Sequence, residues 1–293
     1  MKSIFFGFSI ILATLAGCDS EVSSQSTPKF DAGERLSELT DDRLREASGL
    51  AASVKNPGRL WTLNDSGNEP EVYLVDKELK ISMTIRLAGV ANRDWEDIAV
   101  GSGPDSTLTY IYVADIGDND AVYPHKYIFR FPEPKLGASD HVVISDFERI
   151  TFELEDGMKD SESLLIDPRS ENLYVVSKRE FPVSVYEFAW SATTGDTVTA
   201  SKVASLPMFA IVAADCFERN GDILMKNYTN IYYWENKDNL DVISLLNTTP
   251  QQVPYEAEPQ GESIAWANDG SGFFTLSERK GNQPTYLYFY SQK

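Results

Sequence analysis

The sequence is poor in the side chains that form disulfide bonds or bind soft metals. Its 293 residues include only two cysteines, Cys18 and Cys216, and two histidines, His125 and His141, which we expect in loops. Disulfide frameworks need paired cysteines, and zinc sites are built mainly from cysteine and histidine. The composition therefore argues against a disulfide-stabilised domain and against a zinc or other soft-metal centre.

Long apolar runs are also missing, and no segment is apolar for long enough to span a bilayer. Residues Ile4 to Leu15 follow one positive charge and have the length expected of a secretory signal. They end in Leu15-Ala16-Gly17-Cys18, which resembles a bacterial lipobox. The resemblance implies that residues 1–17 are removed and that lipidated Cys18 is the membrane anchor. It places the protein in a bacterial cell envelope, on the periplasmic or extracellular side.

Positive charge is scarce. The chain has 26 Lys and Arg against 45 Asp and Glu, a formal net charge of −19, and removal of residues 1–17 would make it −20. Such a surface argues against binding to nucleic acid and to anionic lipid. It suits cations and basic partners, or it serves solubility alone.

Several common catalytic motifs are missing. The sequence has no Gly-x-Ser-x-Gly elbow, no Gly-Lys-Ser/Thr phosphate loop, no Gly-x-Gly-x-x-Gly and no His-Glu-x-x-His. Serine hydrolases, P-loop nucleotidases, nicotinamide enzymes and zinc proteases depend on these motifs. The sequence therefore does not favour any of these four classes.

The sequence does contain a phrase that recurs five times. A polar or acidic residue opens a run of small and apolar residues, and an aromatic-rich run follows one turn later. The openings are Ser48-Gly49-Leu50, Glu96-Asp97-Ile98, Glu162-Ser163-Leu164, Asp215-Cys216-Phe217 and Glu262-Ser263-Ile264. They are 48, 66, 53 and 47 residues apart, which is the repeat length of a four-stranded propeller blade.

The repeats predict an all-β fold, a five-bladed β-propeller, with six blades as the alternative. The last repeat stops one strand short, and an open edge strand needs a partner. We expect residues 30–46 to close the ring, although their leucines could also form a short helix. We place the excess of the 66-residue gap in a loop near Pro132 to Ala138. The predicted organisation is a signal peptide (1–17), a flexible Ser/Gln-rich tether (18–30) and the propeller domain (31–293).

The openings predict a metal site. The first strand of each propeller blade lines the central channel, so five equivalent side chains should converge there. Four carboxylates at close range repel one another unless a cation compensates them. A hard ion such as Ca²⁺ accepts carboxylate and hydroxyl oxygens in loose geometry. The predicted calcium ligands are Ser48, Glu96, Glu162, Asp215 and Glu262.

A second ring of polar residues is expected where the partner strands end. For ligand binding we predict Asn64 and Asp65 in this ring and Trp95 and Asp97 beside Glu96. If the site hydrolyses phosphoesters, Asp115 and Glu278 are candidate acid and base groups, with Lys178 and Lys226 holding phosphate. The simpler alternative is that both lysines only neutralise the acidic channel.

The ring of Ser48, Glu96, Glu162, Asp215 and Glu262 resembles that of soluble calcium-activated nucleotidases (apyrases). Ser48-Gly49-Leu50, Trp61 to Asp65 and Tyr112 to Gly117 are similar to phrases of this family. The resemblance implies a five-bladed propeller with axial Ca²⁺ and nucleotide hydrolysis. The chain departs from the family pattern at Asp215, where the family has Ser, and in its third repeat, where a basic cluster is reduced to Lys178-Arg179.

Residues Trp95 to Val100 and Asp115 to Asn119 also resemble uncharacterised bacterial propellers related to SdiA-regulated and esterase-like phytase proteins. The leading hypothesis is a lipid-anchored, extracytoplasmic, monomeric propeller whose calcium-centred, acid- and lysine-lined face binds a ligand or an envelope partner. The alternatives are a calcium-dependent phosphohydrolase, apyrase- or phytase-like, and a structural envelope scaffold.

Overall fold

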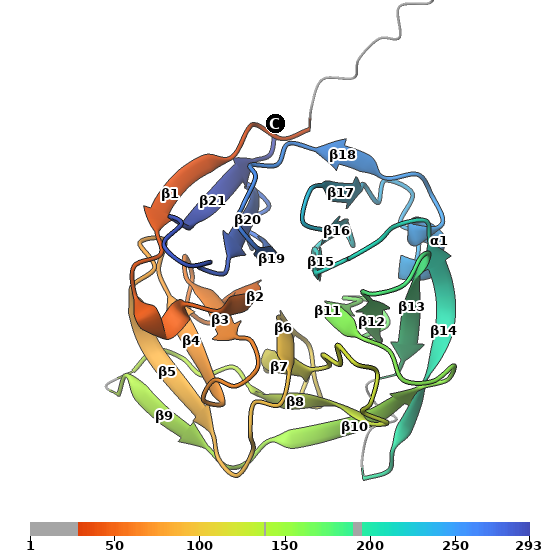
Figure 1. Ribbon diagram of the computed structural model, residues 1–293, viewed down its shortest axis with the longest axis horizontal. Helices are drawn as coiled ribbons and strands as arrows, with labels where there is room; N and C mark the ends of the chain where they lie inside the picture. Colours follow the sequence, from red (N-terminus) through yellow and green to blue (C-terminus); the bar gives the residue numbers. More distant parts are fainter. Residues whose placement is uncertain (1–28, 138, 190–194) are drawn as a thin grey trace, which may run out of the picture.

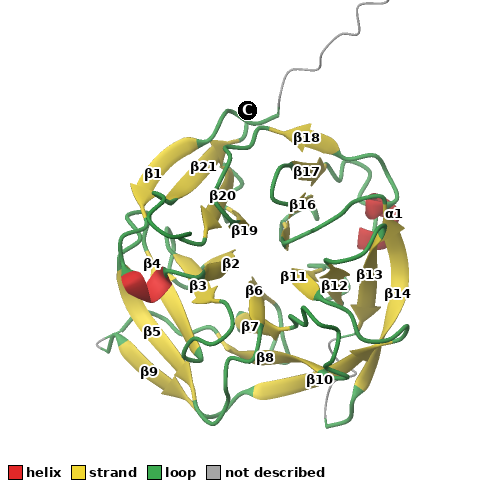
Figure 2. Cartoon of the chain, in the orientation of Figure 1, coloured by secondary structure: helices red, strands yellow, loops and turns green. Residues whose placement is uncertain are grey.

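The computed structural model describes residues 29–137, 139–189 and 195–293. These residues form a β-propeller, with strands stacked outward around a central channel (Figures 1 and 2). The prediction of an all-β propeller is confirmed. The predicted signal peptide, Cys18 and most of the tether lie outside the described residues. Among the helices that are described, none is long and apolar enough to cross a membrane.

The described strands form five antiparallel meanders. The first contains β2 (Ala47–Ala52), β3 (Leu60–Asn64), β4 (Glu71–Val75) and β5 (Ile81–Leu87). The second contains β6 (Trp95–Gly101), β7 (Tyr110–Asp115), β8 (Lys126–Pro132) and β10 (Glu148–Leu154). The third contains β11 (Ser161–Ile166), β12 (Leu173–Ser177), β13 (Val183–Phe188) and β14 (Val198–Leu206). The fourth contains β15 (Ala213–Cys216), β16 (Ile223–Lys226), β17 (Ile231–Trp234) and β18 (Gln251–Val253). The fifth contains β19 (Gly261–Trp266), β20 (Gly272–Ser277), β21 (Tyr286–Ser291) and β1 (Glu34–Glu38).

Two of these meanders share one sheet. The outer strands β10 and β14 pair in parallel, so the second and third meanders form a continuous eight-stranded sheet. We therefore describe the units as meanders and keep the blade number as a prediction.

The long gap between the second and third repeats was predicted in part, because residues 133–137 form a loop as expected. Its excess holds a further strand, β9 (His141–Ile144), which pairs in parallel with β5 and extends the first sheet. We had expected the extra residues to form a loop near Pro132 to Ala138, and we had also expected His141 in a loop. Pairing with β5, more than fifty residues earlier in the chain, leaves no local signal in the sequence.

The N-terminal segment closes the ring, as expected. Strand β1 pairs antiparallel with β21, and the backbone N–H of Leu39 donates to the carbonyl of Thr285 at 2.8 Å. The short helix considered as an alternative also forms, as the 3-10 turn η1 (Asp42–Leu44) capped by Asp41. One short α-helix, α1 (Val242–Leu246), precedes β18.

Large side chains fill the space between neighbouring sheets. Between the fourth and fifth meanders, the Phe30 ring lies edge-on to Tyr233 and Phe273, with ring centroids 5.2 and 5.0 Å apart. The five inner strands β2, β6, β11, β15 and β19 are nearest the centre in Figure 1, and all residues of β11 and β19 are buried. The channel is therefore lined by strands whose polar side chains have little access to water.

Candidate cation site at the channel mouth

Four inner strands are irregular where they begin. The pairing of each with its neighbour shifts register between Ala47 and Leu50, Trp95 and Asp97, Ser161 and Ser163, and Gly261 and Ser263. A bulge leaves one residue without an opposite partner and can redirect its side chain. The unpaired residues include Glu96, Glu162 and Glu262. We call this end of the channel, where β2, β6, β11 and β19 begin, the channel mouth.

The mouth contains two groups of acids that could hold a cation. Glu96, Asp160 and Glu162 each offer an oxygen within 4.8 Å of the others, and all three side chains are buried. Asp65, Asp94 and Glu96 form a second group within the same limit, and Glu96 belongs to both. Hard divalent cations prefer this set of oxygen ligands.

Lys178 is the main counter-charge at the mouth. Its Nζ atom pairs with Glu162 Oε1 and lies 3.7 Å from Glu262 Oε1. The Tyr228 hydroxyl donates to Glu262 at 2.5 Å. Burial lowers the pKa of Lys178, but the carboxylates of Glu162 and Glu262 outweigh burial and raise this pKa overall. Lys178 therefore stays charged and is engaged by acids on the third and fifth meanders, which are not adjacent in the ring.

The remaining acids are poorly compensated. Burial, followed by repulsion from Glu162, raises the pKa of Glu96 well above its usual range. Burial also raises the pKa of Glu162 well above its usual range. Burial and the charge of Glu262 raise the pKa of Glu278 to about 8, and burial and the charge of Asp65 raise that of Asp94 to about 6. The protein without a cation therefore favours protons at the mouth.

Two buried carboxylates have oxygens without a hydrogen-bond donor. Glu162 Oε2 is buried and has no partner, and no described residue donates a hydrogen bond to the Glu96 side chain, which is 5% exposed. Asp160, by contrast, is held in place by the Asp118 N–H at 2.9 Å and Arg179 Nε at 2.7 Å. Buried polar atoms normally have partners, so these orphan oxygens suit an ion.

Three predicted residues instead connect neighbouring inner strands. Ser48 Oγ donates to the Glu96 carbonyl at 2.8 Å, and Asp97 Oδ2 accepts from the Leu164 N–H at 2.8 Å. Asp215 Oδ2 accepts from the Trp266 N–H at 2.7 Å. The hydroxyl of Ser48 and the Asp97 carboxylate are thus committed to the channel wall, away from a ligand-binding surface.

Asp215 does not join the ring of acids. Strand β15 has no bulge, and Asp215 pairs in register with Leu224. It lines a small cavity with Ala52, Val100 and Trp266, which lie at or near the ends of β2, β6 and β19. Asp215 therefore lies toward the opposite end of the channel, and the predicted equivalence of five openings needs correction at this position.

The second ring is brought together only in part. Asp65 and Glu278 lie at the mouth. Asn64 donates to the Arg43 carbonyl at 2.6 Å, and Trp95 is fully buried against Phe129. Both side chains are buried, and Asn64 Oδ1 and Trp95 Nε1 have no hydrogen-bond partner among the described residues.

Three of the four candidate catalytic residues form buried ion pairs: Lys178, as described above, and also Asp115 and Lys226. Asp115 accepts from Arg93 Nε at 3.0 Å. Lys226 is fully buried, 3.3 Å from Glu258 Oε2 and bonded to the Gly261 carbonyl. The predicted phosphate contact of Lys226 does not fit this placement.

Sequence reasoning missed Asp94 and Asp160 as site residues, although a signal was present. Each lies two positions before a glutamate, in Asp94-Trp95-Glu96 and Asp160-Ser161-Glu162. Residues two positions apart point to the same side of an extended chain, so the aspartate and the glutamate of each pair lie on one side where the strand begins. A repeated Asp-x-Glu at strand starts was therefore the better pattern to follow.

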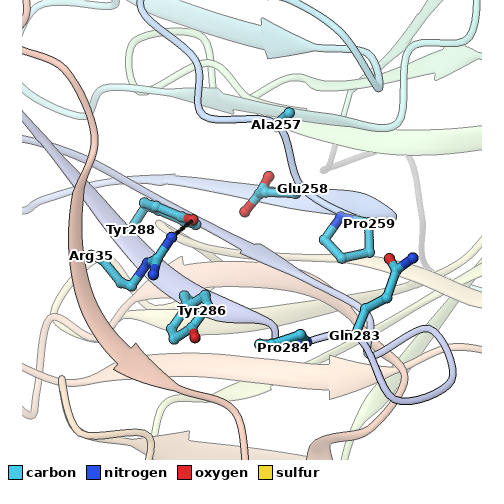
Figure 3. Close-up of a pocket in the computed structure, with 8 residues that line it drawn as sticks. All are labelled: Arg35, Ala257, Glu258, Pro259, Gln283, Pro284, Tyr286 and Tyr288. Carbon is cyan, nitrogen blue, oxygen red and sulfur yellow. Dashed lines mark hydrogen bonds between the residues drawn. The ribbon is translucent and has the colours of Figure 1, made fainter.

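Two pockets bear on where a ligand could bind. One of about 190 Å³ adjoins the acidic cluster and is lined by Asp118, Lys159, Asp160 and Arg179. A larger one of about 510 Å³ lies beside β1 and β21, where Arg35 stacks on Tyr286 at 4.0 Å (Figure 3). The larger pocket does not include any acid of the mouth.

Comparisons with known proteins support the fold. The chain is similar to the PQQ-bound aldose sugar dehydrogenase of Streptomyces coelicolor, with a TM-score of 0.54 and 12% identity over 91% of this chain and 99% of that chain. It is also similar to the gluconolactonase XC5397 of Xanthomonas campestris, with a TM-score of 0.49 and 14% identity over 84% of this chain and 72% of that chain. Both are propellers. No protein-family model and no curated protein matches the chain. At such identity the likeness to the dehydrogenase shows the fold alone.

Proposed function

We propose that the protein is a lipid-anchored, extracytoplasmic β-propeller that binds a divalent cation at the channel mouth and uses it to bind a ligand or partner. The cation contacts Glu96, Asp160 and Glu162. One observation carries this proposal: three buried carboxylates offer oxygens within 4.8 Å of one another, and one of these carboxylates has an oxygen without any partner. The anchor and the envelope location rest on the motif that ends at Cys18.

Calcium is the first candidate for the ion. The cluster offers only oxygen ligands, which excludes soft metals as natural occupants. Ca²⁺ accepts irregular geometry and a mixture of carboxylates, carbonyls and waters, whereas Mg²⁺ demands near-octahedral geometry and keeps several waters. Carboxylates contributed by separate strand ends fit the looser requirement.

A calcium-dependent phosphohydrolase is the second candidate. The pocket of about 190 Å³ beside Asp160 brings Lys159 and Arg179 next to the proposed cation, and cationic side chains beside a metal can hold a phosphate. Lys178 lies deeper and is already paired with Glu162 and Glu262. A structural scaffold without a small-molecule site is the third candidate.

The test measures the melting temperature of the purified protein with EDTA, Ca²⁺ or Mg²⁺, and then phosphate release from a panel of nucleotides and phosphoesters. Calcium at about a hundred times its Kd should stabilise the native state by about 2.7 kcal/mol. Glu162→Gln should remove this gain, and Asp120→Asn, at an exposed acid outside both groups, should keep it.

The outcomes separate the three candidates. Stabilisation by Ca²⁺ without turnover supports the binding protein. Turnover that depends on Ca²⁺ and on Glu162 supports the phosphohydrolase. No response to either ion and no turnover contradicts both and leaves the scaffold.

A further inference from the structure

We infer that the channel mouth binds two divalent cations, with Glu96 as the ligand shared between them. One ion lies among Glu96, Asp160 and Glu162, and the other among Asp65, Asp94 and Glu96. This inference rests on the proposed function, because it extends the same cation site. It adds a second subsite for a hard divalent cation, on the side of the first meander.

Distances support a second subsite. Calcium binds oxygens at about 2.3 to 2.6 Å, so two oxygens of one ion are at most about 5 Å apart. The oxygens within each group of acids lie within 4.8 Å of one another, so each group can surround one ion. A carboxylate has two oxygens and can bridge ions about 3.5 to 4 Å apart. Glu96, the member common to both groups, is the residue placed to do so.

The burial of Glu96 is the independent observation. Its side chain is 5% exposed, and no described residue donates a hydrogen bond to it. Lys178 reaches Glu162 and Glu262 but makes no ion pair with Glu96. Burial raises the pKa of Glu96, and the charge of Lys178 lowers it only slightly by comparison. A buried carboxylate without a donor or a direct ion pair is unfavourable. An ion on each side of Glu96 would satisfy both of its oxygens.

The backbone at Gly117 leaves space for this arrangement. A Cβ atom built on Gly117 would lie 2.3 Å from Glu96 Oε1 and 2.4 Å from Asp94 Oδ2. Both carboxylates therefore approach the backbone at the same point, where any side chain would displace them. The missing side chain at Gly117 thus leaves room for Asp94 and Glu96 on the side of the mouth assigned to the second ion.

Charge favours two ions over one. The mouth gathers seven carboxyl groups: Asp65, Asp94, Glu96, Asp160, Glu162, Glu262 and Glu278. Among the described residues, two cationic groups, Lys178 and Arg179, form ion pairs with members of this set, which leaves a formal excess of five negative charges. One divalent ion would leave three charges at short range, whereas two would leave one. Unscreened repulsion in a buried site makes the second arrangement more favourable.

The experiment counts bound ions. The purified full-length protein is stripped with EDTA, dialysed against Ca²⁺ or Mn²⁺, and analysed for metal per chain, with isothermal titration of the same samples. We expect two ions per chain for the wild type. Asp94→Asn should lose the second ion and keep the first, Asp160→Asn should weaken the first, and Glu96→Gln should weaken both. Asp120→Asn is the matched control and should bind as the wild type does.

Paramagnetic resonance of the Mn²⁺-loaded protein gives a second readout. Two ions bridged by one carboxylate should give a spin-coupled spectrum, and Asp94→Asn should change it to that of an isolated ion. Circular dichroism of each variant checks that it is folded. One ion per chain, unchanged by Asp94→Asn, overturns the two-ion inference and leaves the proposed function standing. No bound ion in the wild type overturns both.

Discussion

At the level of single residues, the backbone rather than side-chain contacts brings the acids of the mouth close together. Glu96 and Glu162 sit at strand bulges, so the backbone fixes their positions whether or not an ion is bound. Their mutual repulsion destabilises the metal-free protein. A bound cation removes this repulsion, and binding is favoured further because the site is already formed.

Gly117→Ala tests the packing of the mouth. The added methyl group would meet Glu96 Oε1 and Asp94 Oδ2 at distances that atoms do not adopt, so both carboxylates must move. We expect calcium affinity to fall about tenfold or more, measured by isothermal titration. Gly137→Ala is the control, because the nearest atom to its Cβ would be the Lys135 carbonyl oxygen at 3.9 Å. Equal affinity in the two variants would contradict the account.

Asp215→Asn tests the separation of Asp215 from the cation site. Burial raises the pKa of Asp215 to about 7 from its ordinary value of 3.8. The folded protein therefore holds this proton more tightly than the unfolded chain does, and stability falls as pH rises from about 4 to 7. Asparagine can keep the acceptor for the Trp266 N–H and removes the charge.

We expect this variant to match the wild type near pH 4 and to exceed its unfolding free energy by about 4 kcal/mol at pH 8. Urea unfolding at the two pH values measures the difference. The calcium response should be unchanged. Loss of that response would instead restore Asp215 as a ligand.

At the scale of the element, ring closure depends on the N-terminal segment. Strand β1 completes the fifth meander, and Phe30, just before it, is fully buried among aromatic rings of the fourth and fifth meanders. Phe30 also forms an isolated bridge with Gln292. The two ends of the described propeller are thus joined by strand pairing and by packing.

Phe30→Ala should lower the unfolding free energy by about 3 to 5 kcal/mol, because it leaves a cavity at the closure. Phe181→Ala, at a residue that is 70% exposed, should change it by less than about 0.5 kcal/mol. Denaturant unfolding measures both. A small effect of Phe30→Ala would mean that the ring is held together without this closure.

Elements and site were predictable to different degrees. Alternating aromatic and β-branched runs with turns between them predicted the meanders, because each strand pairs with its neighbour in the chain. The parallel pairs β5 with β9 and β10 with β14 are non-local and left no such pattern. The aligned openings also could not reveal that β15 lacks the bulge found in the other four inner strands, which is why Asp215 was placed in the ring of acids.

The partners of the two buried lysines could not be predicted from the sequence either. Lys178 and Lys226 occupy similar places in their repeats, yet Lys178 contacts the mouth and Lys226 pairs with Glu258 beneath it. Glu258 belongs to the segment between β18 and β19, and its approach to β16 depends on the tertiary fold. The spacing of the repeats predicts that each lysine lies at the end of a strand, but it does not predict which acid the lysine contacts there.

At the scale of the whole molecule, the proposed anchor and the acidic charge act together. A chain of formal charge −19 has little attraction for an anionic membrane surface, so attachment would depend on the lipid. Cys18→Ala should therefore move the protein from the membrane fraction to the soluble fraction of cells that express it. Cys216→Ala is the control and should remain with the membrane. Wild-type protein found only in the soluble fraction would contradict the proposed anchor.

The most direct test of the central claim is X-ray diffraction from crystals soaked in Mn²⁺, with data collected at the manganese absorption edge. The account predicts anomalous density at the channel mouth, between Glu96 and Glu162, with a second peak beside Asp94 if two ions bind. Ordered carboxylates at the mouth without anomalous density between them, or a peak only beside Asp215, would contradict it.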